Sequence, residues 1–311
     1  MLRSPAQSSR SASAPNVLRA WPAARFSIVV PCFNEEGGII ETVKAIREAL
    51  AQAGVYELIL VDDGSTDRTA DLLAEAAAND DALQVVSHDH NRGYGAALKT
   101  GIRRATSELI VITDADGTYP IDRIVDLVEV AEDADMVVGS RTADEVAYPL
   151  IRKIPKVVLM AYASWMAGER IPDINSGLRV FRRSIAERFR PILPNGFSFT
   201  TTITLAMMTN DYDVRFVPIN YRSRIGSSKI RPIRDTLKFF QLILRTAVYF
   251  APLRAFSPMI LTLGCLALAS AGYDLFVLEN LTDKTVVLSM FTLNTAMFAL
   301  LADLIDKRSR R

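Results

Sequence analysis

The sequence has few cysteines and histidines, the residues that form disulfides or bind zinc. Of its two cysteines, Cys32 closes a predicted strand and Cys265 lies in an apolar stretch. We expect no disulfide between them, and such a chain is typical of a reducing compartment. The two histidines, His88 and His90, flank Asp89. Without a nearby cysteine or third histidine, this triplet is interpreted as a polar loop instead of a metal site.

The sequence also lacks an excess of charge of either sign. It has 36 Lys and Arg against 35 Asp and Glu, so the net charge over 311 residues is +1. This balance gives no global field that would favour nucleic acid or a strongly acidic partner. We therefore predict no nucleic-acid binding. The length is sufficient for one large domain and an appendage.

Residues 1–24 contain neither an acidic residue nor a long apolar core, and they are rich in Ser, Ala, Pro and Arg. This composition does not match a secretory signal peptide. It favours a disordered N-terminal extension. An organelle transit peptide, which has a similar bias, is the alternative.

Residues 25–230 alternate short β-branched runs with helical patterns. Strands are predicted at Phe26–Val30, Glu57–Val61, Leu83–Ser87, Leu109–Thr113, Met136–Val138 and Leu178–Phe181. Helices are predicted at Gly38–Ala53, Thr66–Ala78, Tyr94–Ala105, Ile121–Ala131, Lys156–Met166 and Thr200–Met208. The alternation predicts an α/β domain with a mostly parallel central sheet. In such sheets ligands bind beyond the carboxyl ends of the strands.

Two long apolar segments follow. Ser257–Leu278 contains one charge, Asp274, and Thr285–Ile305 contains one, Asp303. Each is long enough to cross a bilayer, and the short connection between them predicts a two-helix transmembrane hairpin at about residues 255–306. A buried helical hairpin in a soluble protein is the alternative.

Basic residues flank this hairpin on both sides. Residues 231–254 include Ile233–Phe250, whose apolar residues have helical spacing with interspersed Arg and Lys. This pattern predicts an amphipathic helix in the membrane interface, with an ordinary surface helix as the alternative. Residues 307–311 form a basic tail. By the positive-inside rule we expect an integral membrane protein with its catalytic domain and both termini in the cytoplasm.

The strongest local signal is Asp114-Ala115-Asp116, directly after the predicted strand Leu109–Thr113. Two carboxylates one residue apart at a strand end can share Mg²⁺ or Mn²⁺ and bring it to a diphosphate. Such a cation would neutralise charge on a leaving nucleoside diphosphate. By itself the Asp-x-Asp pattern is weak, because acidic turns are common. The position of this motif directly after an apolar strand favours a functional role over an ordinary acidic turn.

Acidic residues follow the first two strands as well. Pro31 to Glu36 ends the first, and Asp62, Asp63 and Gly64 end the second. The second group could accept hydrogen bonds from a base or ribose, although Ser65 and Asp67 are also good helix caps. Asn91 to Gly95 resembles half a dinucleotide fingerprint, but its spacing and position exclude a Rossmann dehydrogenase. A turn that touches a donor remains open.

Phosphate-suited donors occur later in the chain. They are Arg141, Ser176, Arg179, Arg222, Arg224, Ser228 and Lys229. Solvated charge is the ordinary interpretation of such residues. Because the last four directly precede the predicted interface helix, we favour binding of an anionic lipid head group.

Seven motifs in order resemble glycosyltransferase family 2, which has a GT-A fold: residues 29–36 (VVPCFNEE), 61–67 (VDDGSTD), 91–97 (NRGYGAA), 114–117 (DADG), 139–141 (GSR), 175–179 (NSGLR) and 224–229 (RIGSSK). The last three are similar to those of dolichyl- and polyprenyl-phosphate hexose synthases of the mannose and glucose types. The resemblance spans roughly Phe26–Phe250, and the hairpin resembles the family's membrane anchor.

The resemblance implies a single inverting transfer of a hexose from a UDP- or GDP-sugar to polyprenyl phosphate, with Mg²⁺ or Mn²⁺. It implies nucleotide-sugar binding by Pro31, Phe33, Glu35, Val61, Asp63, Asp114, Ala115 and Asp116. Asp114 and Asp116 would hold the metal. The implied catalytic residues are Asp116, Arg141 and Arg224. The implied lipid-phosphate ligands are Arg141, Ser176, Arg179, Arg224, Ser228 and Lys229.

The sequence departs from the family pattern at two places. Phosphomannose synthases of this type usually have Gln two residues after the second Asp, where this chain has Thr118, and this weakens a mannose-specific interpretation. Sugar-accepting relatives place an acidic base in the segment that corresponds to Phe199–Ile203, which has none here. A lipid phosphate, with a second pKa of about 6 as in phosphoserine, is already ionised and needs no base.

Two further hypotheses remain open. One is a transferase that glycosylates a lipid hydroxyl, and the other is a catalytically silent membrane protein that binds a nucleotide-sugar. The first requires a base and activity on lipids without phosphate. The second predicts binding without turnover. The sequence leaves the sugar, the nucleotide, the prenyl length and the oligomeric state open.

Overall fold

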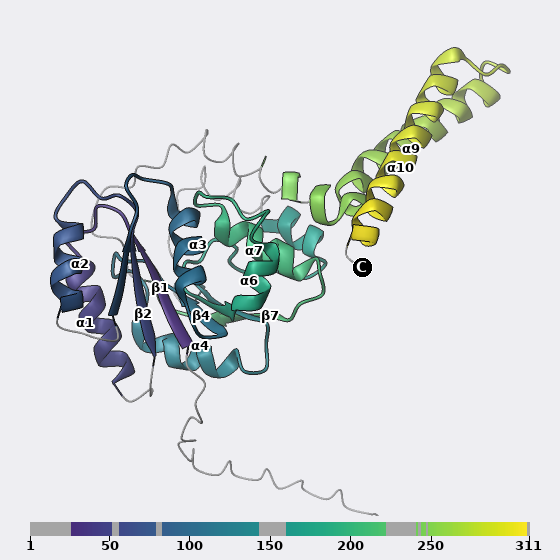
Figure 1. Cartoon of the computed structure of the whole chain (residues 1–311). Coiled ribbons are helices and arrows are strands. Elements are labelled where there is room, and N and C mark those ends of the chain that lie inside the picture. Colours follow the sequence, from purple (N-terminus) through teal and green to yellow (C-terminus); the bar gives the residue numbers. More distant parts are fainter. Residues whose placement is uncertain are drawn as a thin grey trace, which may run out of the picture.

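One seven-stranded sheet forms the centre of the structure, a computed structural model that describes residues 26–51, 56–78, 83–142, 160–221, 241, 244–246 and 248–309. The strand order is β3-β2-β1-β4-β6-β5-β7 (Figure 1). The strands are β1 (Phe26–Cys32), β2 (Glu57–Asp62), β3 (Leu83–Ser87), β4 (Leu109–Ile112), β5 (Met136–Ser140), β6 (Arg179–Arg182) and β7 (Val214–Pro218). All are parallel except β6, which runs antiparallel to both β4 and β5.

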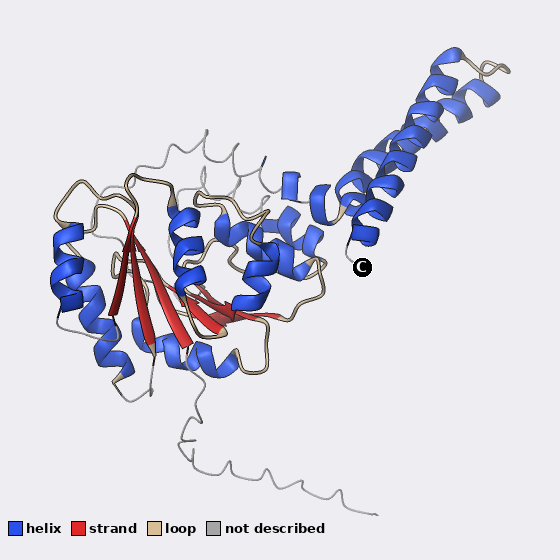
Figure 2. Ribbon diagram, in the orientation of Figure 1, coloured by secondary structure: helices blue, strands red, loops and turns tan. Residues whose placement is uncertain are grey.

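Helices cover both faces of this sheet (Figure 2). One face packs against α1 (Ile39–Leu50), α2 (Thr69–Ala78), η1 (Ile121–Arg123) and α4 (Ile124–Val130). The other packs against α3 (Tyr94–Arg104), α6 (Arg183–Phe189) and α7 (Phe199–Met208). Alternate residues of β1 divide between the two cores: Ile28 and Val30 face one, and Val29 faces the other. Both faces are apolar, as a sheet covered by helices requires.

The six predicted strands are present, and the mostly parallel sheet is confirmed. Two elements were not predicted. The edge strand β7 is only five residues long, and α6 begins directly after β6 without a turn residue between them. The predicted helix Lys156–Met166 begins outside the described residues, but residues 160–167 are helical.

The two C-terminal apolar segments form the antiparallel helices α9 (Pro252–Phe276) and α10 (Asp283–Ser309), which project away from the sheet (Figure 1). Both are long and apolar enough to cross a membrane, and only 6% and 17% of their most apolar windows are buried. This exposure differs from that of a core helix in a soluble protein. The charge inside the first segment has a local role, because Asp274 accepts hydrogen bonds from the amide and hydroxyl of Thr282 at 2.8 and 2.5 Å.

The start of the hairpin is fixed to the α/β domain. Phe250 packs edge-on against Phe189 of α6, with ring centroids 6.0 Å apart. Arg254 donates a hydrogen bond of 2.9 Å to the carbonyl of Met166. Most of the predicted interface helix lies outside the described residues, although residues 241, 244–246 and 248–250 are helical.

Candidate active site

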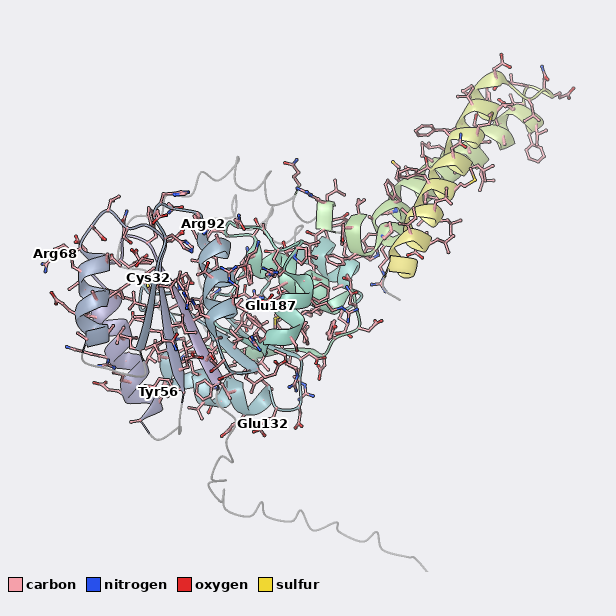
Figure 3. All side chains as sticks on the ribbon, in the orientation of Figure 1. Cys32, Tyr56, Arg68, Arg92, Glu132 and Glu187 are labelled. Carbon is pink, nitrogen blue, oxygen red and sulfur yellow. The ribbon has the colours of Figure 1, made fainter. Side chains whose placement is uncertain are left out.

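The loops beyond the carboxyl ends of β1, β2, β4 and β5 meet at one edge of the sheet. Figure 3 shows Cys32 at the end of β1 and Arg92 before α3 near this edge, with Tyr56 and Glu132 at the opposite edge. Because β6 is antiparallel, it begins where its neighbours end, and Arg179 pairs with Ile112 of β4 and Val138 of β5. Segment 173–178 therefore enters the same edge as the Asp114–Asp116 motif.

Two neighbouring elements hold the Asp114 carboxylate. The hydroxyl of Tyr94, the first residue of α3, donates a hydrogen bond of 3.0 Å to Asp114 Oδ1. Burial and the negative charge of Asp114 raise the pKa of Tyr94 well above its ordinary value, so the hydroxyl keeps its proton. On the other side, a Cβ on Gly177 would lie 2.8 Å from both carboxylate oxygens. Glycine therefore allows the backbone to approach Asp114 closely.

The turn after Asp114 orients the second carboxylate. Asp116 Oδ1 accepts hydrogen bonds from the hydroxyl of Thr118 at 2.7 Å and from its amide at 3.2 Å. Gly117 supports the turn with a φ of 68°. The carbonyl of Ala115 accepts a hydrogen bond of 2.8 Å from Thr42 of α1. Thr118, which stands in place of the expected Gln, therefore positions Asp116.

Asp114 and Asp116 offer a pair of hard oxygen donors that suits Mg²⁺ or Mn²⁺. Among the described residues, no group of three or more His, Cys, Asp or Glu side chains could hold a metal ion. The protein would thus supply the two carboxylates, and water and phosphate oxygens would complete the shell. This incomplete set fits a metal that binds together with a phosphorylated ligand.

Arg141 follows β5 and is held firmly by Asp173. Its Nε and Nη2 donate to the two oxygens of Asp173 at 2.7 and 2.9 Å, and its amide donates at 3.1 Å. Burial opposes the charged form of Asp173, but the contacts with Arg141 outweigh it, so the pKa of Asp173 lies below its ordinary value. The guanidinium lies 5.2 Å from the ring centroid of Tyr221, and its side chain keeps 26% exposure.

Ser176 and Arg179 lie beneath this surface, because both are fully buried. The Ser176 hydroxyl donates to the carbonyl of Gly139. Arg179 donates to the carbonyls of Ser176, Ile174 and Thr200 at 2.6, 2.7 and 3.0 Å, and also to the Thr204 hydroxyl. Burial lowers the pKa of Arg179 to about 10, which leaves it charged at neutral pH. This geometry supports positioning of segment 174–177 by both residues, not direct contact with a lipid phosphate.

Reciprocal hydrogen bonds join the loops after β1 and β2. The amide of Asn34 donates to Ser65 Oγ at 3.0 Å, and the amide of Thr66 donates to Asn34 Oδ1 at 2.8 Å. The amide of Glu35 donates to the Thr69 hydroxyl at 2.9 Å. Phe33 is exposed beside this joint and Pro31 is partly buried. The predicted nucleotide-binding loop is thus anchored to the beginning of α2.

Asp63 organises the turn before α3. Its two oxygens accept hydrogen bonds from the amides of Arg92 and Gly93 at 3.0 and 2.7 Å, and His88 Nδ1 lies 2.7 Å from Oδ1. His88 therefore belongs to a structural network, as its polar-loop interpretation implies. Val61 has no exposed surface, so its side chain belongs to the core.

Four residues of this edge were not predicted as site residues: Tyr94, Tyr119, Asp173 and Gly177. Tyr119 accepts a hydrogen bond of 2.6 Å from the Gly177 amide. Gly177 lay within a recognised motif, whereas no spacing connected Asp173 with Arg141, 32 positions away. Arg222, Arg224, Ser228 and Lys229 lie outside the described residues.

This sheet, with one antiparallel strand entering beside an Asp-x-Asp turn, defines a protein with the GT-A glycosyltransferase fold. A crystal structure of glucosyl-3-phosphoglycerate synthase from Mycobacterium tuberculosis, in complex with Mn²⁺, UDP-glucose and phosphoglyceric acid, matches with a TM-score of 0.55 and 21% identity. The match covers 75% of this chain and 80% of that one. S. aureus TarS with UDP-GlcNAc matches with a TM-score of 0.53 and 18% identity, over 73% and 67% of the chains.

The chain belongs to glycosyl transferase family 2, whose model matches residues 27–190. It is 33% identical to the undecaprenyl-phosphate 4-deoxy-4-formamido-L-arabinose transferase of Pseudomonas aeruginosa, over 84% of this chain and 75% of the relative. It is 28% identical to the low-salt glycan biosynthesis hexosyltransferase Agl6 of Haloferax volcanii, over 81% of this chain and 61% of the relative. This chain therefore spans less than two thirds of Agl6.

Proposed function

We propose that this protein transfers a single hexose from a UDP- or GDP-sugar to a polyprenyl phosphate, with inversion at the anomeric carbon. The observation that carries the proposal is the position of segment 173–178, which lies against the Asp114 carboxylate and binds Arg141 through Asp173. The domain that contains this site is joined to the apolar hairpin α9–α10. The arabinose transferase of P. aeruginosa, whose name includes undecaprenyl phosphate, supports the same acceptor class.

The donor would bind across the loops after β1, β2 and β4. In this arrangement Pro31, Phe33 and Glu35 would contact the nucleoside, together with the backbone near Val61 and Asp63. Asp114 and Asp116 would hold Mg²⁺ or Mn²⁺, which would stabilise negative charge on the departing diphosphate. Tyr94 and Thr118 keep these two carboxylates in place.

The acceptor phosphate would approach from the side of Arg141. One of its ionised oxygens would form a bond to C1 of the sugar, and the bond from C1 to the diphosphate oxygen would break. The electron pair of that bond leaves with the nucleoside diphosphate. Arg141, oriented by Asp173, would reduce the repulsion between the two anionic partners. Arg224, Ser228 and Lys229 are proposed to add further donors.

The first turn of α7 contains no carboxylate that could act as a base, and this supports a phosphate acceptor over a hydroxyl. The first turn of α7 has threonines where a sugar-accepting relative would have a carboxylate, and Thr201 donates a hydrogen bond of 2.6 Å to Asn175. Asp173, in the same region, already forms an ion pair with Arg141 and is therefore not available as a base. A phosphate monoester is already nucleophilic near neutral pH, so positioning and leaving-group stabilisation suffice.

We further propose that α9 and α10 cross the membrane and that the catalytic domain, residues 25–230, and both termini face the cytoplasm. Basic residues on both sides of the hairpin support this orientation. The orientation can be measured with a cysteine added at the C-terminus, by testing whether a membrane-impermeant thiol reagent labels it in right-side-out vesicles. Labelling before lysis would refute the orientation.

Sugar transfer in detergent with purified polyprenyl phosphate tests the function. Asp116→Asn should lower kcat by at least about 100-fold, because it removes a charged group from the diphosphate site. The matched control is Asp122→Asn, an exposed carboxylate on η1 that should retain activity. Full activity of Asp116→Asn would exclude the metal assignment. Transfer to a polyprenol without phosphate would favour a transferase that glycosylates a lipid hydroxyl. Donor binding without turnover on any lipid would favour a catalytically silent protein that binds a nucleotide-sugar.

A further inference from the structure

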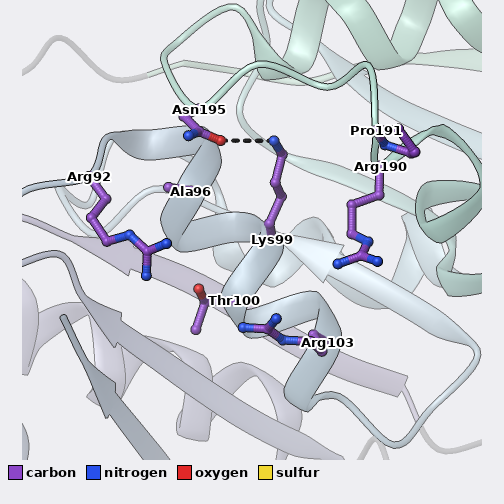
Figure 4. A pocket seen from close by; sticks show the side chains of 8 residues that line it. All are labelled: Arg92, Ala96, Lys99, Thr100, Arg103, Arg190, Pro191 and Asn195. Atoms are coloured by element: carbon purple, nitrogen blue, oxygen red, sulfur yellow. Dashed lines mark hydrogen bonds between the residues drawn. The ribbon is translucent and has the colours of Figure 1, made fainter.

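A pocket of about 430 Å³ lies on the outer face of α3, opposite the segment that follows α6 (Figure 4). Helical spacing brings Ala96, Lys99, Thr100 and Arg103 to this face. Of the lining residues, only Arg92 lies at the carboxyl edge of the sheet, and the function proposed above gives its side chain no contact with the donor or the acceptor. The pocket is lined by Arg92, Ala96, Lys99, Thr100, Arg103, Arg190, Pro191 and Asn195.

The pocket is strongly basic. Four of its eight lining side chains are cationic, and none is acidic. Arg190 forms an ion pair with Glu187 at 3.0 Å. Within the described part of the chain, no carboxylate pairs with Arg92 or Arg103. The lining therefore carries an excess of about three positive charges, in a protein whose net charge is only +1.

Lys99 gives the pocket a fixed cation. Its Nζ donates to the carbonyl of Leu193 and, at 2.8 Å, to Asn195 Oδ1, as the dashed line in Figure 4 shows. Burial, and then the charge of Arg190, lower the pKa of Lys99 below its ordinary value. The charge of Arg190 thus opposes that of Lys99, and an anion bound between these two side chains would reduce that repulsion.

We propose that this pocket binds a phosphate-bearing anion other than the sugar donor and the lipid acceptor. Arginine suits phosphate because its planar donors contact two oxygens at once, and three arginines line the pocket. Its volume is suited to a small molecule or to one lipid head group. Both sources share the same phosphate chemistry.

The bound anion would stabilise the donor site through α3. Thr100 lines the pocket, and its hydroxyl lies 2.9 Å from His88 Nε2. The other nitrogen of His88 contacts Asp63, which also accepts the Arg92 amide. Since this turn leads into Tyr94, which holds Asp114, an anion on Arg92 and Arg103 would reinforce the network beneath the donor loops.

Binding of tripolyphosphate to the full-length protein in phosphatidylcholine nanodiscs tests the proposal. EDTA is present, so the probe cannot bind through a metal at Asp114 and Asp116. Calorimetry should show saturable binding that Arg103→Gln weakens by roughly tenfold. The matched control is Arg104→Gln, which removes the same charge from the neighbouring exposed residue and should leave the affinity unchanged.

Unfolding temperature supplies a second readout that does not depend on catalysis. Tripolyphosphate should raise it in the wild type and in Arg104→Gln, but much less in Arg103→Gln. No saturable binding, or equal weakening in both variants, would overturn the proposal. Repeating the titration with phosphatidylglycerol nanodiscs separates the two sources. Weaker tripolyphosphate binding there in the wild type and Arg104→Gln, but not in Arg103→Gln, identifies a lipid head group, because general repulsion from the anionic bilayer would weaken all three alike. Unchanged or uniformly weakened binding identifies a soluble ligand.

Discussion

Gly177→Ala is the substitution that most directly probes the geometry of the Asp114 site. The new Cβ would lie 2.8 Å from both Asp114 oxygens, about half an ångström closer than ordinary contact allows. Either the carboxylate or segment 174–177 must move, and overpacking of this kind costs about 1–3 kcal/mol of unfolding free energy. Because Arg179 fixes that segment through the Ser176 and Ile174 carbonyls, we expect Asp114 to move.

The assay combines thermal unfolding with sugar-transfer kinetics at varied metal concentration. Gly177→Ala should lower the unfolding temperature by a few degrees, at roughly 2–4 °C per kcal/mol. It should also lower kcat and raise the metal concentration needed for half-maximal rate. Gly196→Ala is the matched control, because a Cβ there has no neighbour within 4 Å. If Gly177→Ala and Gly196→Ala have the same unfolding temperature, kcat and metal dependence, Gly177 does not lie as close to Asp114 as the structure shows.

Three further predictions concern buried charges. Asp173→Asn should lower kcat by about tenfold or more with little change in donor affinity, since it releases Arg141; an equal loss of donor affinity in binding measurements would contradict this role. Arg179→Met should lower the unfolding free energy by roughly 3 kcal/mol or more, because three buried carbonyls each lose a hydrogen bond from the guanidinium; wild-type stability in urea would refute it. The pKa of Glu57 is lowered because hydrogen bonds from Ser27, Thr106 and Gln84 outweigh burial, and that of Asp173 is lowered as well. Their stabilisation should be complete above pH ~4.5 and lost as the pH falls through the lowered pKa values; a Glu57→Gln variant with an unchanged pH profile would exclude the Glu57 contribution.

Much of this fold follows from local sequence pattern. The β-branched runs and helical spacings predicted six strands and the parallel sheet, because a strand covered by helices on both faces must be apolar throughout. The edge strand β7 lacks that signal, since none of its five residues is fully buried. The antiparallel direction of β6 depends on contacts between distant segments, which periodicity does not encode.

The site divides in the same way. Asp114 and Asp116 were recognisable because two carboxylates, separated only by Ala115, follow an apolar strand. Their supports, Tyr94 and Gly177, lie 20 and 63 positions from Asp114, so only tertiary structure brings them together. Arg179 illustrates the opposite case. Its motif and charge indicated phosphate binding, whereas the structure buries it completely among carbonyl groups.

Transfer of a labelled hexose to polyprenyl phosphate and to the matching polyprenol, in identical micelles with Mg²⁺ or Mn²⁺, tests the central claim most directly. The proposed function predicts labelled product with the phosphate alone, and at least about a 100-fold loss with Asp116→Asn. Comparable transfer to the polyprenol, or no transfer to either lipid despite donor binding, would contradict it.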